Sequence, residues 1–85
     1  MINYVQGLVT SGELNGQYGA DLIPDLEVAN AYLNSGDPNS AIFELKHFIS
    51  QTKLDINDGV LSSTNGQTLI DAANDIINSL SNQVL

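Results

Sequence analysis

The sequence contains no cysteine and no tryptophan, and only two of its 85 residues, Lys46 and Lys53, are basic. Without cysteine the chain has neither disulfide bonds nor thiolate ligands for a metal. Ten acidic residues give a net charge of −8, and such a surface repels nucleic-acid phosphates and anionic lipids. We therefore expect no nucleic-acid partner.

Long hydrophobic runs are also missing, since no apolar stretch approaches the roughly 20 residues that span a bilayer. The first residues, Met1–Val5, lack the basic region, apolar core and cleavage site of a signal peptide. We expect no membrane insertion. The chain is then either an intracellular protein or a fragment of a longer one.

What the sequence does contain is a strong helical pattern, which is clearest from Gly36 onward. Gly36 suits the end of one helix, while Asp37 can cap the next and Pro38 fits its first turn. Apolar residues then recur at helical spacing and form a wide stripe, at Ala41, Leu45, Phe48 and Thr52, flanked by Ile42, Ile49 and Ile56. This pattern predicts a helix over residues 38–56.

Three further helices are predicted at residues 2–10, 17–34 and 63–80. Pro24 lies inside the second of these segments, where it removes a backbone hydrogen bond and is expected to kink or break the helix. With no strand pattern, the fold class predicted for this single domain is all-α. The four helices are expected to form an antiparallel bundle made of two αα-hairpins.

The two halves of the chain are similar at an offset of 47 residues. Both contain the pattern Gly-x-Leu-(four residues)-Gly-(two residues)-Leu-Ile. In the first half the pattern consists of Gly12, Leu14, Gly19, Leu22 and Ile23. In the second half it consists of Gly59, Leu61, Gly66, Leu69 and Ile70. This similarity indicates a possible internal pseudo-repeat. Each hairpin would use the same connection, in which glycine ends a helix and leucine folds back onto the core.

Acidic residues in and near the connections do not form a recognisable metal site. The segment Asp55–Gly59 resembles the start of a calcium loop, but its glycine is off register and no glutamate follows at the twelfth position. We interpret it as a solvated helix end. The pairs Asp21 and Asp25, and Asp71 and Asp75, lie four residues apart and are expected on solvated helix faces.

No catalytic constellation is expected either. His47 is the only histidine, and we expect it at the surface or at the boundary of the core. A bundle of this size should be filled by its own side chains, leaving no substrate pocket of several hundred Å³. The sequence therefore predicts a protein that is not an enzyme, with no catalytic residue, no metal and no cofactor.

Binding to a protein partner is the function class that remains. Aromatic residues are enriched at interaction hot spots, and Phe43 lies beside the apolar stripe of its helix. The two equivalent connections, residues 12–17 and 58–67, are the other regions of interest. The candidate partner-binding residues are Phe43, Tyr18, Asp58, Asn65 and Gln67.

Two segments resemble a known family. The first has the spaced residues Ala29, Leu33, Gly36, Asp37, Ala41, Leu45, Phe48 and Ile49, and the second has Gly59, Leu61, Ser62, Gly66, Gln67, Leu69, Ile70, Ala73, Ile76 and Ile77. Together they resemble the FIMAH modules, which are small helical modules appended to large secreted bacterial proteins. The resemblance covers roughly residues 22–80, and Pro24 departs from the family pattern. It transfers no catalytic residue and implies a secreted or surface-displayed accessory module.

The leading hypothesis is thus a non-catalytic accessory module, excised from a larger secreted or cell-surface protein and present as a monomer or weak dimer. Its partners would be another protein or neighbouring domains of the parent chain. The alternative is a free-standing, acidic cytoplasmic protein that inhibits a basic, nucleic-acid-binding partner by charge mimicry. A third, weaker option is a surface module whose acidic loops bind calcium.

Overall fold

The computed structural model describes residues 2–14 and 16–84, and the side chains of residues 4–14 and 16–82. The described chain forms four α-helices and no strand. Their bounds are α1 (Ile2–Thr10), α2 (Gly16–Asn34), α3 (Pro38–Asn57) and α4 (Ser63–Val84). The predicted all-α fold is confirmed.

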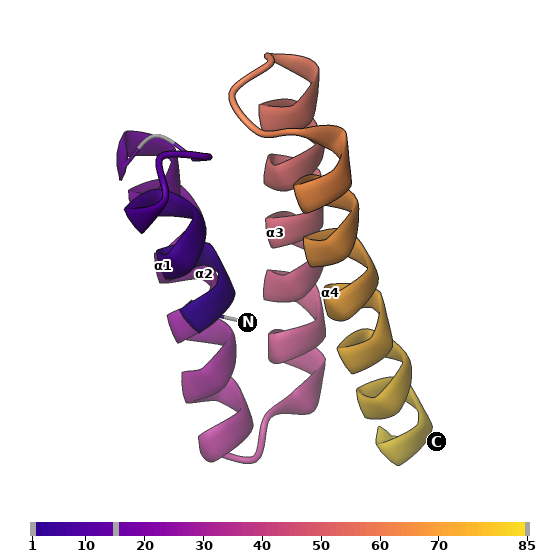
Figure 1. Ribbon diagram of the computed structural model, residues 1–85. Coiled ribbons are helices and arrows are strands. Elements are labelled where there is room, and N and C mark those ends of the chain that lie inside the picture. Colours follow the sequence, from indigo (N-terminus) through magenta and orange to yellow (C-terminus); the bar gives the residue numbers. More distant parts are fainter. Residues whose placement is uncertain (1, 15, 85) are drawn as a thin grey trace.

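Successive helices run antiparallel, and α3 packs against both α2 and α4 (Figure 1). Helix α1 lies against α2 and is about half its length. The α1–α2 and α3–α4 connections lie at the same end of the bundle, and the short α2–α3 connection lies at the other end (Figure 1). The predicted arrangement as two antiparallel hairpins is thus observed.

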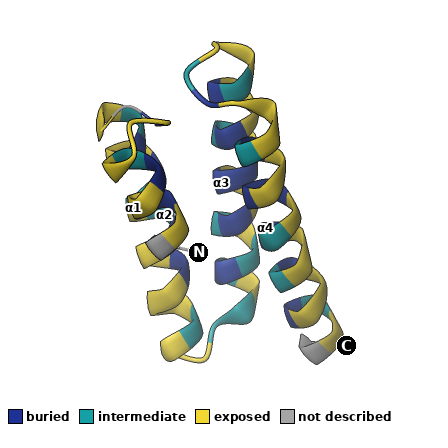
Figure 2. Ribbon diagram, viewed as in Figure 1, coloured by how far each residue is buried: buried dark blue, intermediate teal, exposed yellow. Residues whose placement is uncertain are grey.

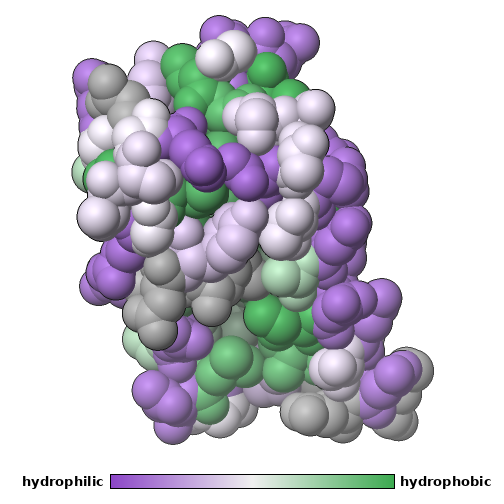
Figure 3. Space-filling model, viewed as in Figure 1, coloured by the Kyte–Doolittle hydropathy of each residue, from purple (hydrophilic) through white to green (hydrophobic). Residues whose placement is uncertain are grey.

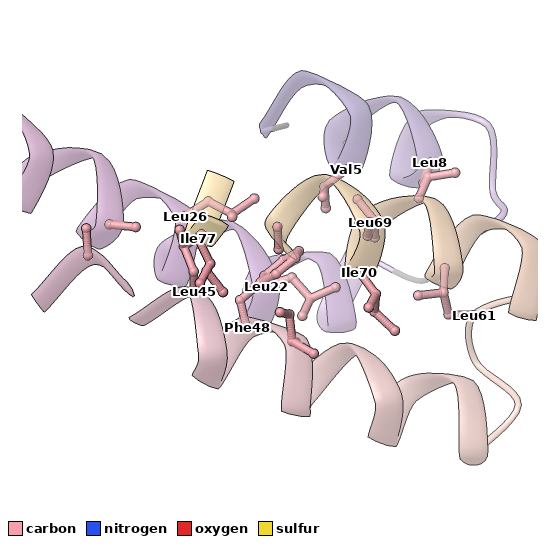
Figure 4. Close-up of a cluster of buried hydrophobic side chains, with 14 of the residues drawn as sticks. Val5, Leu8, Leu22, Leu26, Leu45, Phe48, Leu61, Leu69, Ile70 and Ile77 are labelled. Carbon is pink, nitrogen blue, oxygen red and sulfur yellow. The ribbon is translucent and has the colours of Figure 1, made fainter. Parts of the chain in front are cut away.

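Each helix contributes its apolar stripe to one common core, as Figures 2 and 4 show. In α3 this stripe includes Ala41, Leu45 and Phe48, all at most 3% exposed. The Thr52 side chain is also buried in α3, and its hydroxyl donates a hydrogen bond to the Phe48 carbonyl oxygen over 2.8 Å. Hydrophilic residues run along the outer side of α4, while hydrophobic residues gather between the α1–α2 pair and α4 (Figure 3).

Helix α3 begins as predicted. The Asp37 side chain accepts a hydrogen bond from the Ser40 backbone N–H over 3.1 Å, and Pro38 occupies the first helical position. The hydrogen bonds from Ser40 stabilise the carboxylate and lower the pKa of Asp37 below its usual value. Asp37 therefore both ends the α2–α3 connection and fixes the first residue of α3.

The pseudo-repeat is visible in the backbone of the two equivalent connections. Gly12 and Gly59 follow α1 and α3 with φ of 82° and 79°, a left-handed conformation that suits glycine. Leu14 and Leu61, two residues further on, are buried at 1% and 3% exposure. Glycine thus ends each first helix and leucine returns to the core, as the sequence predicts.

The equivalence extends to a close contact inside each hairpin. A Cβ atom placed on Gly19 would overlap with the Val9 side chain, and one placed on Gly66 would overlap with Ile56. Val9 and Ile56 are themselves 47 residues apart, so the same offset relates both pairs. Glycine is needed at these positions of α2 and α4 because the preceding helix packs directly against their backbone.

A kink or a break was predicted at Pro24, and the break is not observed, because α2 continues through Pro24 as a single helix. Pro24 has no N–H to donate to the carbonyl of Ala20, four residues earlier. Both residues are exposed, so water can satisfy the free carbonyl. The buried residues Leu22 and Leu26 on either side hold the helix against the core.

The other helix bounds lie close to the predicted ones, with two corrections. Helix α4 extends to Val84 rather than ending near residue 80, because its last turns remain packed: Leu80 is 7% exposed and Ser81 is half-buried. Asp55 is not part of a solvated helix end but is 2% exposed. It occupies the position equivalent to Leu8 of α1, 47 residues earlier, and therefore faces the core.

Candidate protein-interaction surface

The side of α3 that faces away from the core carries two exposed hydrophobic side chains. Phe43 is 75% exposed and Leu54 is 54% exposed. They are 11 residues apart, and because a helix has 3.6 residues per turn they lie on nearly the same side, about 16 Å apart along the axis. The buried residues Ala41, Phe48 and Thr52 occupy the opposite side.

Both lysines of the protein also lie on this outer half of α3. Lys46 and Lys53 are exposed and seven residues apart, which places them two turns from each other on one side. Within the described parts of the chain, the one ion pair joins His47 to Asp25, so neither lysine is paired. We call the side formed by Phe43, Lys46, Lys53 and Leu54 the α3 outer face.

The chemistry of the α3 outer face differs from that of the rest of the surface. The protein has ten acidic residues and a net charge of −8, yet its only two lysines lie beside two exposed apolar side chains. An aromatic residue supplies apolar contact area, and flanking cations attract and orient a partner of opposite charge. The α3 outer face is therefore suited to an acidic protein surface with an apolar centre.

Of the five residues that sequence analysis singled out for partner binding, only Phe43 belongs to the α3 outer face. Tyr18 is half-buried near the start of α2 and packs against the core. Asp58 is exposed and caps the end of α3, its N–H donating to the Leu54 carbonyl over 2.9 Å. Phe43 is about 20 Å from Asp58 along the helix axis.

Asn65 and Gln67 lie in the first turns of α4, at the end that carries the two equivalent connections. The Tyr4 hydroxyl donates to Asn65 Oδ1 over 3.2 Å, and Asn65 Nδ2 donates to Glu13 Oε2 over 2.9 Å. Asn65 thus joins α1, the α1–α2 connection and α4. The Gln67 amide donates to Asp71 within α4. These contacts give Asn65 a structural role, and the connections do not form one site with Phe43.

Leu54, Lys46 and Lys53 were not predicted as members of this surface. Their position on the helix could have been predicted, because helix periodicity places all three away from the buried apolar stripe of α3. What the sequence did not show is that no other helix covers this side of α3. That follows only from the positions of α2 and α4.

The structure also contains an open groove of about 440 Å³ between α1 and α2. The sequence had predicted that the bundle would leave no pocket of several hundred Å³. The groove is lined by uncharged residues, namely Gln6, Val9, Thr10, Gly16, Gly19, Ala20 and Ile23. The Thr10 hydroxyl donates to the Gln6 carbonyl oxygen, and the described lining residues include no acid–base group.

Among the residues that the structure describes, no helix is both long and apolar enough to cross a bilayer. No curated protein and no solved structure matches the chain. The family model of the FIMAH domain matches residues 1–78, which is nearly all of the sequence and includes both hairpins. The chain therefore belongs to the FIMAH domain family.

Proposed function

We propose that this domain is a non-catalytic interaction module of a larger secreted or cell-surface protein, and that it docks a neighbouring domain of that protein through the α3 outer face. The observation that carries the proposal is the placement of Phe43, Leu54 and both unpaired lysines on one uncovered side of α3. Membership of the FIMAH family supports the role of an accessory module.

The small size of the α3 outer face favours a tethered partner. Two large apolar side chains and two lysines span about 16 Å of helix, whereas stable association of separate proteins usually buries about 1,600 Å² in total. A domain in the same chain binds at an effective concentration that reaches the millimolar range for short linkers. A small contact is then sufficient.

Charge complementarity defines the chemistry of this partner. Its surface would present carboxylates to Lys46 and Lys53 around an apolar patch that receives Phe43. Because the domain carries ten acidic residues, such a partner is repelled from its acidic surfaces. The two lysines would position the partner on α3.

The first experiment determines the size and location of the native product, using an antibody raised against this domain. We expect a protein much larger than the 9.1 kDa of this chain, in the medium or on the cell surface. A small cytoplasmic product would contradict the proposal. Salt-sensitive binding of that product to a basic protein would then support charge mimicry instead.

The second experiment tests the docking surface by acetylating lysines in the isolated domain and in the native product. Since the domain has only two lysines, mass spectrometry reports on Lys46 and Lys53 individually. We expect slower acetylation of both in the native product. Equal reactivity in the two samples would show that no neighbouring domain covers the α3 outer face.

A matched pair of variants separates docking from folding. Phe43→Ser in the native product should restore fast acetylation of both lysines, because it removes the apolar anchor. The change should leave stability within about 0.5 kcal/mol, since Phe43 is 75% exposed. Val28→Ser, at a 42% exposed position of α2, is the control and should leave the lysines protected.

A further inference from the structure

Three potential metal ligands from two helices converge on the side of the bundle where α2 meets α3. Asp25 comes from α2, and Glu44 and His47 come from α3. Each offers one ligand atom, and these atoms all lie within 4.8 Å of one another. His47 Nδ1 is 3.0 Å from Asp25 Oδ2. Glu44 and His47 are three residues apart, a spacing that places both on one side of a helix.

The two carboxyl groups of this cluster are half-buried and lack a fixed counter-charge. Among the described residues, the only basic group paired with either of them is the imidazole of His47. A cation bound between the carboxylates would relieve this unfavourable arrangement.

We propose that Asp25, Glu44 and His47 form a binding site for a divalent transition-metal ion of the Zn²⁺ class, which links α2 to α3. One imidazole nitrogen and two carboxylate oxygens are a donor set that Zn²⁺ and related ions accept. Calcium prefers six to eight oxygen ligands, and this cluster supplies too few. The His47 side chain is 59% exposed, so water completes the coordination at the surface.

This site differs from the expectation of the sequence, which assigned Asp25 to a solvated face and predicted no metal. The four-residue spacing of Asp21 and Asp25 suggested that both are solvated. In the structure Asp21 is exposed, whereas Asp25 is half-buried and faces α3. The three residues are spread over 23 positions of the chain, and only the antiparallel packing of α2 on α3 brings them together.

The test is calorimetric titration of the tag-free 85-residue chain with ZnCl₂, and separately with CaCl₂, near neutral pH. We expect one Zn²⁺ per chain, no comparable Ca²⁺ binding, and a rise in Tm with Zn²⁺ because the ion binds the folded state. Since His47 is the only histidine, Zn²⁺ should also shift a single set of imidazole NMR signals.

Variants distinguish this site from general attraction of cations to an acidic surface. His47→Gln and Asp25→Asn should each weaken Zn²⁺ binding by at least about 10–100-fold, the loss typical of changes in the surroundings of a metal ligand. Asp71→Asn removes one exposed carboxylate on α4 and should bind Zn²⁺ normally. Circular dichroism of each variant confirms that it folds. Absence of Zn²⁺ binding, equal binding by all variants, or preference for Ca²⁺ would overturn the proposal.

Discussion

Gly66 lies so close to Ile56 that a Cβ atom at Gly66 would overlap with Cδ1 and Cγ1 of the isoleucine side chain. The contact joins the end of α3 to the start of α4. Gly19 and Val9 form the equivalent contact in the first hairpin. A glycine at this position therefore sets how closely the two helices of each hairpin approach.

Replacing Gly66 with alanine should destabilise the domain by up to about 2 kcal/mol. Overpacking costs about 1–3 kcal/mol, while the better helix propensity of alanine returns about 1 kcal/mol. Urea unfolding followed by circular dichroism measures the difference. Adding Ile56→Val removes Cδ1 and should recover part of the loss, which a double-mutant cycle would show.

Gly7→Ala is the control for this prediction. Gly7 is also inside a helix, but a Cβ atom there meets nothing within 4 Å. The change should therefore stabilise the domain by about 0.5–1 kcal/mol. If Gly66→Ala increased the stability by the same amount, the contact with Ile56 would not limit the size of the side chain at position 66.

Asp55→Asn should stabilise the domain at pH 7, because it replaces a buried carboxyl, whose ionisation burial disfavours, with an amide that does not ionise. Asp55 is 2% exposed and its Oδ2 atom has no hydrogen-bond partner. Burial raises the pKa of Asp55, a hydrogen bond from Gln51 opposes the rise, and Asp21 and Asp58 add to it. Ionisation of this carboxyl therefore costs more in the folded state than in the unfolded state.

The pH dependence of this variant follows from the direction of the shift. The pKa of Asp55 is higher in the folded protein than in the unfolded protein, so binding of this proton stabilises the fold. The gain in the free energy of unfolding is complete below about pH 4, the ordinary pKa of aspartate. It is lost as the pH rises through the higher pKa of the folded protein. The stability difference between Asp55→Asn and the unchanged protein should thus appear above about pH 4. Equal stability of the two proteins at every pH would contradict the burial of this carboxyl.

Asn65→Asp should lower stability by about 1 kcal/mol, the usual contribution of one hydrogen bond. The substitution keeps an acceptor for the Tyr4 hydroxyl but places a carboxylate opposite Glu13, which now accepts from Asn65 Nδ2. Adding Glu13→Gln should recover most of the lost stability. High salt should also reduce it, since the site is exposed and the repulsion is screened. A loss that neither Glu13→Gln nor salt reduces would contradict this arrangement.

Leu14→Ala and Leu61→Ala should each destabilise the domain by about 2–5 kcal/mol, the range for buried leucines. Both residues lie in connections rather than helices, yet they are at most 3% exposed. Val28→Ala, at a 42% exposed position, is the control and should change stability by less than about 0.5 kcal/mol. Thermal unfolding compares the three variants. Small effects at both leucines would show that the connections do not contribute to the core.

Much of the fold was predictable because its signals are local. Asp37 and Pro38 start α3 through contacts within four residues, and Gly12 and Gly59 end helices by their own backbone conformation. The 3.6-residue period of the apolar residues assigned the core side of α3 without reference to any other helix. The family resemblance rests on the same local features, and the family match confirms it.

Departures from prediction occur where contacts between helices decide the outcome. Pro24 was expected to kink or break α2, and no break occurs, because burial of Leu22 and Leu26 on either side holds the helix against the core. Asp25 and Asp55 were both expected to be exposed to water. Asp25 is half-buried because α2 packs against α3, and Asp55 is buried because it faces the core. Local spacing does not reveal the side chains supplied by a neighbouring helix.

The sequence by itself determined that this chain is an acidic, four-helix FIMAH domain with two similar hairpins, because charge, capping and periodicity are properties of short segments. The tertiary structure alone decided which side of α3 remains uncovered, and that Asp25 meets Glu44 and His47. The physical reason is that a helix has several outward-facing sides of similar polarity. Only the packing of its neighbours determines which of them water, a partner or an ion can reach.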